Sequence, residues 1–541
     1  MSETTALSST ALGGPGPTWA ELEPEPTDVP QSRAMLERAQ WASRAFRTLD
    51  KPAVDRIVAA VVEAALQHAQ EYAERAVAET GFGVVEHKRR KNEASSRGVL
   101  DFYAGSDFVT PRIDEAAKLV ELPRPAGVVL ALTPSTNPVA TVYFKVLLCL
   151  MTRNAVVVSP HPMAKRVCAD AARLLGAAAE AAGAPAGVVQ VVAEPTIPLI
   201  DALMTDPRTS VIVATGGNAV VRASYRSGNP ALGVGPSNVP VLVDSTADLR
   251  AAAQRIVDSK SFDNSCLCTN ESVVIVEDSV AAAFTRALRS AGAYLLDRQE
   301  TDKLRELVFP NGRFTPAVVG KSATWLAGQA GLSVPHNTLV LVAEFDEVVP
   351  EEVLAHEKLT PLLGLVRVPS VAAGIKAARA LLRITGAGHS AAVHSTDPET
   401  ILAFGAACDV LRVSVNVGNS LGGSGIETHL APTMTIGTGY AGGSSVGENL
   451  RPDHLINWVR LAYNADAKVP MGDFAGLTPW RTVPGQVPPY PVPSNAQGET
   501  ARVRHEHRAE VAQGDDADLR EELRRIIIEE LHDLIGGDHR G

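Results

Sequence analysis

Two cysteines stand two residues apart in the polar stretch SKSFDNSCLCTNESVVIVE, which covers residues 259–277. Cys266 and Cys268 directly precede the β-branched run SVVIV, so we expect them in a loop that enters a buried strand. Backbone N–H groups of such a loop favour the thiolate, which is the nucleophilic form of cysteine. Two ordinary buried cysteines are the alternative that the spacing leaves open. No metal site is expected, because no second cysteine pair or nearby histidine accompanies them.

A second polar segment, ALTPSTNPVATVYFK, joins a strand that ends near Leu132 to a helix that begins near Val139. Asn137 lies in this turn. An amide at the carboxyl end of a parallel strand can donate a hydrogen bond to a developing oxyanion. Capping of the following helix is the alternative role for Asn137.

A third segment, VIVATGGNAVVRAS, runs from a strand through Thr215, Gly216 and Gly217 into a helix. Small residues let a phosphate group approach a helix N-terminus, where free N–H groups and the helix dipole favour an anion. The segment therefore predicts a phosphate-facing turn, although so short a motif is weak by itself.

Composition limits the class of protein in which these segments act. The chain has 541 residues, of which 45% are hydrophobic and 21% charged, so two large folded lobes are expected. A net charge of −11 disfavours nucleic acid as a partner. The longest apolar runs fall far short of the roughly 18 residues of a membrane span. The first 30 residues lack the features of a secretory signal, and five cysteines form no paired framework, so a cytoplasmic location is expected.

The elements that must position these segments follow from hydrophobic periodicity. Residues 32–105 are rich in Ala, Glu and Arg and predict helices. Between about Leu122 and Val417, short β-branched runs alternate with longer Ala- and Leu-rich stretches, which predicts an α/β fold with two parallel sheets. The runs that predict strands are GVVLAL, AVVVS, VVQVV, SVIVAT, VPVLV, SVVIV, LLGLVRV, SAAVHS and VLRVSVN.

Taken together, these segments resemble the aldehyde dehydrogenase superfamily, and more closely its CoA-acylating branch, which includes enzymes packaged in bacterial microcompartments. The resemblance runs from about Arg33 to Asn464. The motifs that carry it are LTPSTNPVATVYFK, NAVVVSPHPMAK, ATGG, GNPALGVGPSNVP, SKSFDNSCLC, HEKLTPLLGL, GAGHSAAVHS, VSVNVGNSLGG and LAPTMTIGTGYAGGSSVGENL.

The resemblance implies an aldehyde dehydrogenase-like architecture: a Rossmann-like cofactor domain, a catalytic domain and a small oligomerisation arm. A homo-oligomer is expected by analogy. The implied divisions are a flexible leader at 1–31, an NAD(P)-binding domain at 32–243, a catalytic domain at 244–426, a return and oligomerisation segment at 427–465, a Pro-rich linker at 466–514 and an amphipathic tail helix at 515–541.

Site residues are implied position by position. Cys268 stands six residues after Phe262 of the FDN motif and matches the nucleophile, whereas Cys266 matches no chemical position. Asn137 matches the amide that, with the N–H of Cys268, holds the oxyanion. His389, in the motif GAGHS, is expected to orient CoA or assist proton transfer, with a structural hydrogen-bonding role as the alternative.

The cofactor-binding positions are also implied by the resemblance. Glu357 matches a carboxylate that binds the nicotinamide ribose. NAD is the expected cofactor, because no Arg or Lys lies nearer to the SPHP loop than Lys165 and Arg166. NADP is the alternative, because the loop shows no obvious acid that would reject a 2′-phosphate. The positions matching the pyrophosphate turn and the adenosine-side loop are Thr215, Gly216, Gly217, Ser159 and Pro160.

One departure from the wider superfamily indicates the reaction. Hydrolytic members carry a Glu in an E-L-G-G-K motif, and the corresponding segment here, ALGVGPSN at 231–238, contains no carboxylate. Without that base the cysteine thioester is expected to wait for a CoA thiol, giving an acyl-CoA. A hydrolytic dehydrogenase and a structural cargo or adaptor protein with a degenerate site are the alternatives. Acetaldehyde, propionaldehyde, sulfoacetaldehyde and amino-aldehydes all suit this chemistry as substrates.

About 75 residues at the end of the chain extend beyond the resemblance. The segment DLREELRRIIIEELHDLIGG, from Asp518, places leucines and isoleucines on one helical face after a Pro-rich stretch. It resembles an encapsulation peptide, so a microcompartment shell protein is the expected partner. A helix docked on its own catalytic core is the alternative.

Overall fold

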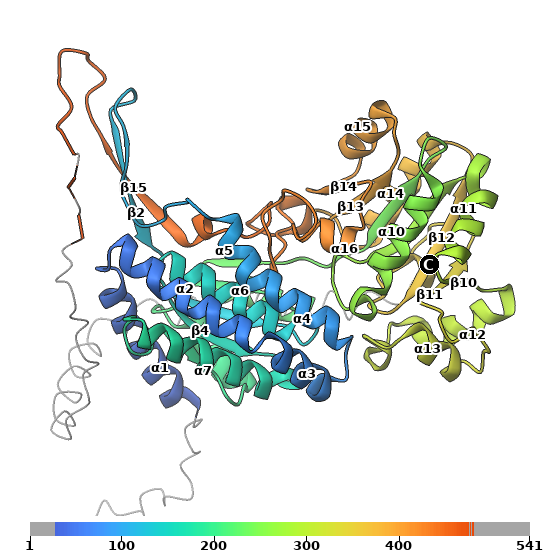
Figure 1. Cartoon of the computed structure of the whole chain (residues 1–541), viewed down its shortest axis with the longest axis horizontal. Helices are drawn as coiled ribbons and strands as arrows, with labels where there is room; N and C mark the ends of the chain where they lie inside the picture. Colours follow the sequence, from blue (N-terminus) through green and yellow to red (C-terminus); the bar gives the residue numbers. More distant parts are fainter. Residues whose placement is uncertain (1–27, 475, 478, 481–541) are drawn as a thin grey trace, which may run out of the picture. The chain divides into compact units, whose positions relative to one another are not determined.

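The computed structural model describes residues 28–474, 476–477 and 479–480. Three sheets are present in this part of the chain: two parallel sheets and one antiparallel sheet (Figure 1). The predicted α/β class with two parallel sheets is confirmed. The predicted leader lies almost wholly outside the described residues, as does most of the Pro-rich linker and the whole tail helix.

The first parallel sheet has five strands in the order β5-β4-β3-β6-β7. Its central strands contain almost only valine, leucine and alanine and are buried on both faces, as expected for a parallel sheet covered by helices. The strands are β3 (Val128–Thr133), β4 (Ala155–Pro160), β5 (Val189–Val191), β6 (Val211–Ala214) and β7 (Ala231–Gly233). The helices that pack around it are α1 (Asp28–Phe46), α2 (Lys51–Gln67), α6 (Pro138–Met151), α7 (Lys165–Ala181), α8 (Ile197–Thr205) and α9 (Asn218–Arg226).

A further helical segment follows α2 and reaches toward the second sheet. It comprises α3 (Ala69–Thr80), α4 (Val85–Glu93), a π-helical turn (Ala94–Gly98) and α5 (Val99–Phe102). The predicted helical region at 32–105 is therefore confirmed. Figure 1 shows α4 on the side of the first domain that faces the second.

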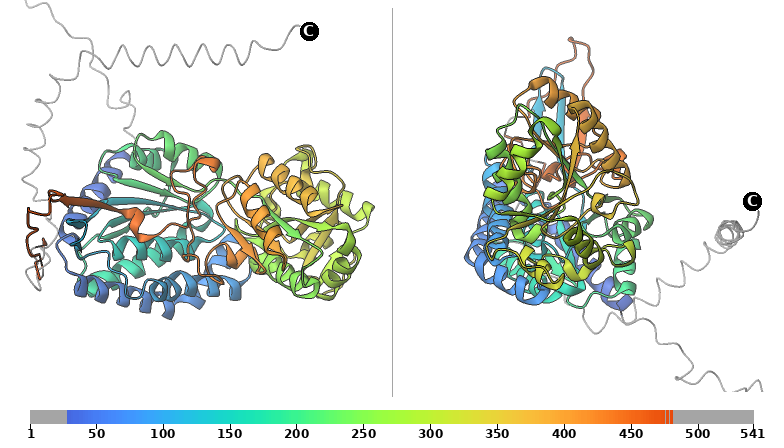
Figure 2. Two further views of the ribbon diagram at one scale, coloured as in Figure 1. Left: turned by 90° about the horizontal axis from the view of Figure 1, so that it is seen from above. Right: turned by 90° about the vertical axis from the view of Figure 1, so that its right-hand side faces the viewer.

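The second parallel sheet has seven strands in the order β10-β11-β12-β9-β8-β13-β14. Its core is separate from that of the first sheet. The strands are β8 (Val239–Val243), β9 (Glu271–Glu277), β10 (Ala293–Leu295), β11 (Val340–Glu344), β12 (Leu362–Val368), β13 (Ala391–His394) and β14 (Val413–Val415). The helices are α10 (Leu249–Ser261), α11 (Asp278–Ser290), α12 (Arg298–Val308), α13 (Ala323–Gln329), α14 (Val371–Ile384), α15 (Pro398–Ala407) and α16 (Asn419–Gly422), and Figure 2 shows them in two further views.

The segment that connects the two parallel sheets lies earlier in the chain than the sequence predicts. Residues 239–243 were assigned to the first domain, but β8 pairs with β9 and β13 inside the seven-stranded sheet. The first sheet ends with β7, so the chain crosses between the sheets at 234–238. The apolar run VPVLV looks the same in either sheet, which is why its pattern did not assign it to one of them.

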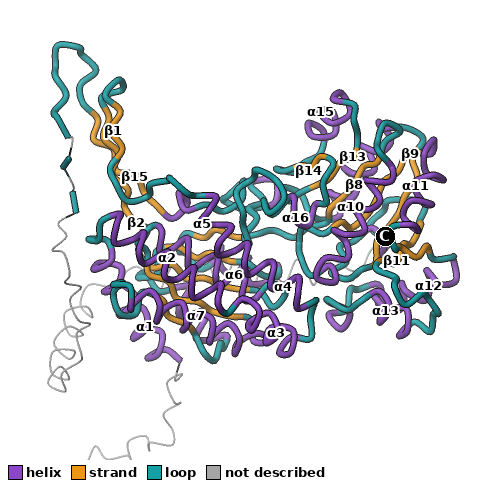
Figure 3. Tube along the Cα trace, viewed as in Figure 1, coloured by secondary structure: helices purple, strands orange, loops and turns teal. Residues whose placement is uncertain are grey.

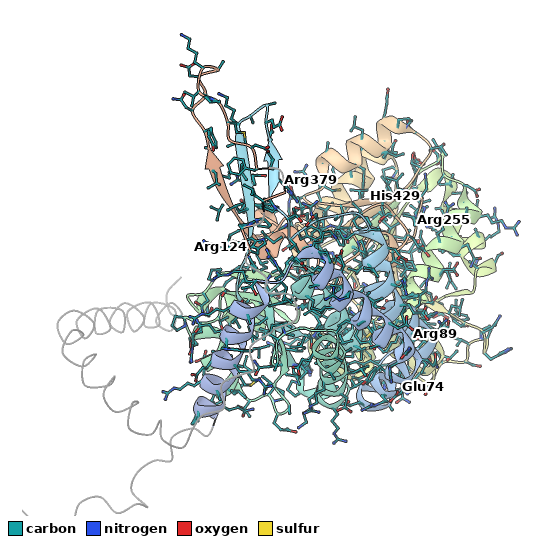
Figure 4. The ribbon with its side chains drawn as sticks, turned by 60° about the vertical axis from the view of Figure 1, so that its left-hand side comes forward. Glu74, Arg89, Arg124, Arg255, Arg379 and His429 are labelled. Atoms are coloured by element: carbon teal, nitrogen blue, oxygen red, sulfur yellow. The ribbon has the colours of Figure 1, made fainter. Side chains whose placement is uncertain are left out.

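The third sheet is a narrow antiparallel arm. Its strands are β1 (Arg112–Asp114), β2 (Leu119–Pro125) and β15 (Ile456–Ala462), with Ile456 opposite Pro125. Figure 3 shows these strands standing apart from both parallel sheets, and Figure 4 shows their side chains, with Arg124 near the base. Two of the three strands, β1 and β2, lie within the range 32–243 that the sequence predicts for the cofactor domain, and the oligomeric role of the arm stays a prediction.

Short helical turns complete the described elements. They are the 3-10 turns Pro162–Ala164, Phe262–Ser265, Pro310–Gly312, Pro316–Val318, Val353–Ala355, Tyr440–Gly442 and Pro452–Leu455. None of the helices in the described ranges combines the length and hydropathy that a bilayer crossing requires.

Candidate active site

The loop that carries Cys268 has an unusual backbone. It begins in the 3-10 turn Phe262–Ser265 and ends where β9 starts. Asp263, Asn264 and Ser265 have φ angles of 51°, 51° and 67°, so three successive residues with side chains adopt the left-handed region. Each such residue costs on the order of 1–3 kcal/mol, and the conformation persists only where surrounding contacts hold it.

Those contacts come mainly from α4. The Asp263 carboxylate accepts hydrogen bonds from Val84 N at 2.7 Å, from Lys88 Nζ at 3.0 Å and from Lys91 Nζ. The backbone N–H of Asp263 donates to His87 Nδ1 at 2.8 Å. All these groups are buried or half-buried, so the strained loop is fixed by a charged network from a distant part of the chain.

The other end of the loop is held by neighbours in the second domain. Ser265 Oγ donates to Asn270 Oδ1 at 2.7 Å, and the same oxygen accepts from the buried Lys260 at 2.6 Å. The Asn264 amide donates to the carbonyl of Gly320 at 3.0 Å. Side-chain hydrogen bonds therefore restrain both flanks of the cysteine pair.

Among the five cysteines, Cys268 is the half-exposed one, and the other four are buried. Burial raises the pKa of the Cys268 thiol to about 12, and the nearby Glu357 carboxylate acts in the same direction. The backbone N–H of Cys268, Arg412 and Lys91 oppose this effect by stabilising the thiolate. The thiol is therefore protonated at neutral pH in the free protein and needs a proton acceptor when it reacts.

Asn137 stands at the N-cap position of α6, yet its side chain makes no capping hydrogen bond. Its carboxamide oxygen accepts a hydrogen bond from Lys91 Nζ instead. Its Nδ2 donates to Thr136 Oγ1 at 3.3 Å. The helix-capping alternative is therefore wrong for the side chain, and the amide N–H groups are turned away from Lys91.

Glu357 lines a cleft of about 420 Å³ together with Asn218, the first residue of α9. Its carboxylate accepts a hydrogen bond from Ser237, which belongs to the segment 231–238 that lacks an acidic residue. Burial raises the pKa of Glu357 to about 7, whereas Ser237 and the buried Lys260 favour its charged form. Glu357 therefore changes charge near neutral pH, close to the thiol of Cys268.

The predicted cofactor-side residues meet at the carboxyl ends of β3, β4 and β6. Ser159 and Pro160 end β4 opposite Leu132 and Thr133 of β3. Thr215 follows β6 and donates its N–H to the carbonyl of Leu132 at 3.2 Å. The structure therefore brings the adenosine-side loop and the turn before α9 to one edge of the sheet, as the strand order requires.

The turn itself leaves room for a ligand. Gly217 is the N-cap of α9 and has no side chain with which to cap it. A Cβ atom at Gly217 would meet no other atom within 4 Å, whereas one at Gly216 would lie 2.8 Å from Val220 Cγ1. Open space beside an uncapped helix N-terminus fits a pyrophosphate group.

His389 is fully buried, just before β13. Its Nδ1 lies 3.0 Å from Ser390 Oγ, and its Nε2 has no hydrogen-bond partner in the described structure. Burial lowers the pKa of His389 to about 3, assisted by the Arg412 guanidinium, so the imidazole is neutral. Arg412 donates to the carbonyl of His389 at 2.9 Å and also influences Cys268, which connects these two predicted residues.

Sequence reasoning missed three charged residues at this site: Lys88, Lys91 and Arg412. The lysines are spaced i, i+3 on one helix, which places them on one face. Arg412 interrupts the apolar run VLRVSVN. For Arg412 the available signal was a charge inside an apolar pattern, whereas the two lysines lie in the polar stretch VEHKRRKNE, which gives no such signal. Neither pattern indicates which group the charge contacts. Within the described ranges, no group of three or more His, Cys, Asp or Glu residues could hold a metal ion.

Comparison with known proteins agrees with this architecture. The model of the aldehyde dehydrogenase family matches residues 24–301. The bifunctional aldehyde-alcohol dehydrogenase of Escherichia coli K12 is 37% identical over 81% of this chain, which spans only 50% of that protein. The acetylating succinate-semialdehyde dehydrogenase of Clostridium kluyveri is 34% identical over 81% of this chain and 97% of its own length.

Solved structures of aldehyde dehydrogenases are also similar to this chain. An acetylating aldehyde dehydrogenase from Geobacillus thermoglucosidasius has a TM-score of 0.80 and 36% identity, covering 81% of this chain and 97% of its own. A propionaldehyde dehydrogenase from a fucose-utilisation microcompartment of Clostridium phytofermentans has a TM-score of 0.74 and 29% identity, covering 80% and 97%. A propionaldehyde dehydrogenase of Rhodopseudomonas palustris, with bound CoA and an acylated cysteine, has a TM-score of 0.72 and 29% identity, covering 80% and 97%. The chain belongs to the aldehyde dehydrogenase family.

Proposed function

We propose that this protein is a CoA-acylating aldehyde dehydrogenase that oxidises a short-chain aldehyde to an acyl-CoA. The observation that carries the proposal is the half-exposed Cys268 in a rigidly held loop, beside a segment, 231–238, that contains no carboxylate to activate water. Acetylating relatives and the CoA-bound structure of the R. palustris enzyme support the same reaction.

In the first half of the proposed reaction, the Cys268 thiolate attacks the aldehyde carbon. The negative charge that develops on the aldehyde oxygen is stabilised by the N–H groups of Asn137 and by the backbone N–H of Cys268. A bound nicotinamide cofactor supplies the hydride acceptor, and oxidation leaves an acyl thioester on Cys268. The thiol proton passes to solvent water before the attack, and this transfer is needed because the pKa of Cys268 lies near 12 in the free protein.

The residues present fit a dinucleotide. The open turn at Thr215–Gly217 and the N-terminus of α9 would hold the pyrophosphate, and Glu357 would bind the nicotinamide ribose across the same cleft. Ser159 and Pro160 would lie on the adenosine side. We propose NAD as the cofactor, with NADP as the alternative.

In the second half, a CoA thiol takes the acyl group from Cys268. Exchange of one thioester for another is nearly balanced in free energy and needs no activated water. We propose that His389 orients the CoA thiol or assists its proton transfer. Its buried Nε2 has no hydrogen-bond partner in the described structure, and its neutral imidazole can accept a hydrogen bond or donate one.

Measuring NADH formation with acetaldehyde or propionaldehyde, with and without CoA, tests the proposal. Sustained turnover should require CoA, and Cys268→Ala should abolish it while Cys266→Ala retains it. Many turnovers without CoA would instead indicate a hydrolytic dehydrogenase. Absence of any turnover in the folded wild-type protein, with every aldehyde tried, would favour an adaptor protein.

We also propose that the enzyme is cargo of a bacterial microcompartment. The support is the predicted amphipathic segment 515–541, which lies outside the described residues, and the microcompartment origin of the C. phytofermentans relative. Deletion of 515–541 should abolish co-sedimentation with shells without changing the rate of NADH formation. Unchanged co-sedimentation would overturn this part of the proposal.

A further inference from the structure

A buried cluster of three charged residues joins the nucleophile loop to the turn that carries Asn137. It consists of Lys88 and Lys91 of α4 and Asp263, whose side chains are 3%, 1% and 0% exposed. We propose that Lys91 is a positioning residue for catalysis, which acts by orienting the Asn137 amide and does not touch the aldehyde. The inference rests on the proposed function, because it concerns the oxyanion of that reaction.

The orientation of Asn137 follows from the chemistry of its partner. An ammonium group has three donors and no acceptor, so only the carboxamide oxygen of Asn137 can face Lys91. This contact fixes the carboxamide oxygen on the side of α4 and directs Nδ2 away from Lys91, where it donates to Thr136 Oγ1 at 3.3 Å. A cation on the oxygen also polarises the amide, which strengthens its N–H groups as donors.

Lys91 also touches the nucleophile loop. Its ammonium group contacts the Asp263 carboxylate and lies 3.5 Å from the carbonyl of Cys266, two residues before the nucleophile. One side chain therefore binds both Asn137 and the loop whose Cys268 N–H is the other proposed oxyanion donor. This arrangement sets the separation of the two donors, which a fixed oxyanion requires.

The charges of the cluster do not cancel. Two lysines share one carboxylate, so one positive charge is left between Asn137 and the nucleophile loop. Burial lowers the pKa of Lys91 to about 8, and Asp263 opposes this effect, so most of the population carries the charge at neutral pH. A buried cation without a counter-ion of its own is energetically costly, and this one lies against the carboxamide oxygen of Asn137 and the carbonyl of Cys266.

Lys88 provides a matched comparison. It is equally buried and binds the same oxygen of Asp263, but its other contact is the backbone carbonyl of Thr136 at 2.9 Å. Replacement of either lysine by methionine removes one charge from the same cluster and leaves Asp263 with the other lysine. Only the Lys91 variant removes the contact with the Asn137 side chain.

The experiment measures the single burst of NADH formed from enzyme, aldehyde and NAD without CoA. The burst needs only attack and hydride loss, so it is independent of whether CoA or water later removes the acyl group. The variants are Lys91→Met, Lys88→Met, Asn137→Ala and the double variant Lys91→Met with Asn137→Ala. Thermal unfolding of each variant controls for folding, and Lys91→Gln replaces Lys91→Met in the cycle if the methionine variant does not fold.

We expect Lys91→Met to slow the burst by about 10- to 100-fold, with the KM for NAD changed by less than about twofold. Lys88→Met should slow it by clearly less. In the Asn137→Ala background, Lys91→Met should cause almost no further loss, because both changes remove the same donor. Equal losses from the two lysine variants, or independent losses from Lys91→Met and Asn137→Ala, would overturn the inference. A wild-type burst followed by CoA-independent turnover would overturn the acylating function and leave the role of Lys91 standing.

Discussion

The nucleophile loop at 262–268 and the turn at 215–217 are built in opposite ways. The loop holds strained backbone in place with buried side chains from both domains, including the charged cluster of Lys88, Lys91 and Asp263. The turn uses two glycines, an uncapped helix and empty space. A nucleophile must stand in one place before the substrate arrives, whereas a dinucleotide must enter and leave, so only the first site benefits from rigid side-chain contacts.

The comparison predicts its largest effect at Asp263. Asp263→Asn leaves two buried lysines without an anion and should lower the free energy of unfolding by about 3–5 kcal/mol. Urea unfolding followed by circular dichroism measures this loss. Asp170→Asn, which removes exposed ion pairs with Arg75 and Arg173, is the control and should cost at most about 1 kcal/mol. Similar losses in both variants would mean that the cluster does not hold the loop.

A smaller loss, confined to catalysis, is expected at Asn137. Asn137→Ala removes one proposed oxyanion donor, and kcat should fall by about 10²–10³-fold while the KM for NAD is unchanged. Steady-state kinetics with saturating CoA measure both constants. An increased KM for NAD with normal kcat would instead show that Asn137 contributes to binding in the ground state.

The turn should respond differently to substitution. Gly217→Ala adds a methyl group that meets no protein atom, so the free energy of unfolding should change by less than about 0.5 kcal/mol. The KM for NAD should rise by roughly tenfold, because the methyl group occupies the space proposed for the pyrophosphate. Gly216→Ala is the matched variant and should also lose stability, since its Cβ would crowd Val220. An unchanged KM in Gly217→Ala would place the pyrophosphate elsewhere.

The smallest effect is expected from the charge of the Glu357 carboxylate on the reactivity of Cys268. Iodoacetamide reacts with the thiolate, so alkylation of Cys268 should accelerate about tenfold per pH unit below its pKa of about 12. The Glu357 carboxylate disfavours the thiolate, so Glu357→Gln should lower the pKa of Cys268 and speed alkylation a few-fold at pH 8.

Mass spectrometry of the Cys268 peptide measures the alkylation rate. Glu352→Gln, on the same segment but paired with Arg305, is the control and should leave the rate unchanged. Slower alkylation in Glu357→Gln would show that Glu357 acts as a proton acceptor for the thiol.

The parts of the fold that depend on local residue patterns were predictable from the sequence. Runs of β-branched residues predicted both parallel sheets, and resemblance identified candidate positions such as Cys268 and Glu357. Strands β7, β10 and β11 were not predicted. β7 and β10 have only three residues each and lack a continuous β-branched run, whereas β11 has five residues, most of them in the apolar run LVLVA, and its pattern was overlooked. The contact between Lys91 and Asn137 joins residues 46 apart, and that between Lys91 and Asp263 joins residues 172 apart. Hydrophobic periodicity describes which face is buried and carries no information on such polar partners.

The double crossing of the chain between the two sheets has a consequence for how the protein can be divided. The chain leaves the first domain at 234–238 and returns beside the same place, where Gly235 N–H donates to Thr438 Oγ1 at 3.2 Å. The seven-stranded domain is thus an insertion whose two ends lie together, the arrangement in which an inserted unit folds most independently of its host. We expect residues 239–426 to fold when produced alone. Such a fragment would contain Cys268 and the contact of Ser265 with Asn270 but not α4, so its nucleophile loop would be held from one side only.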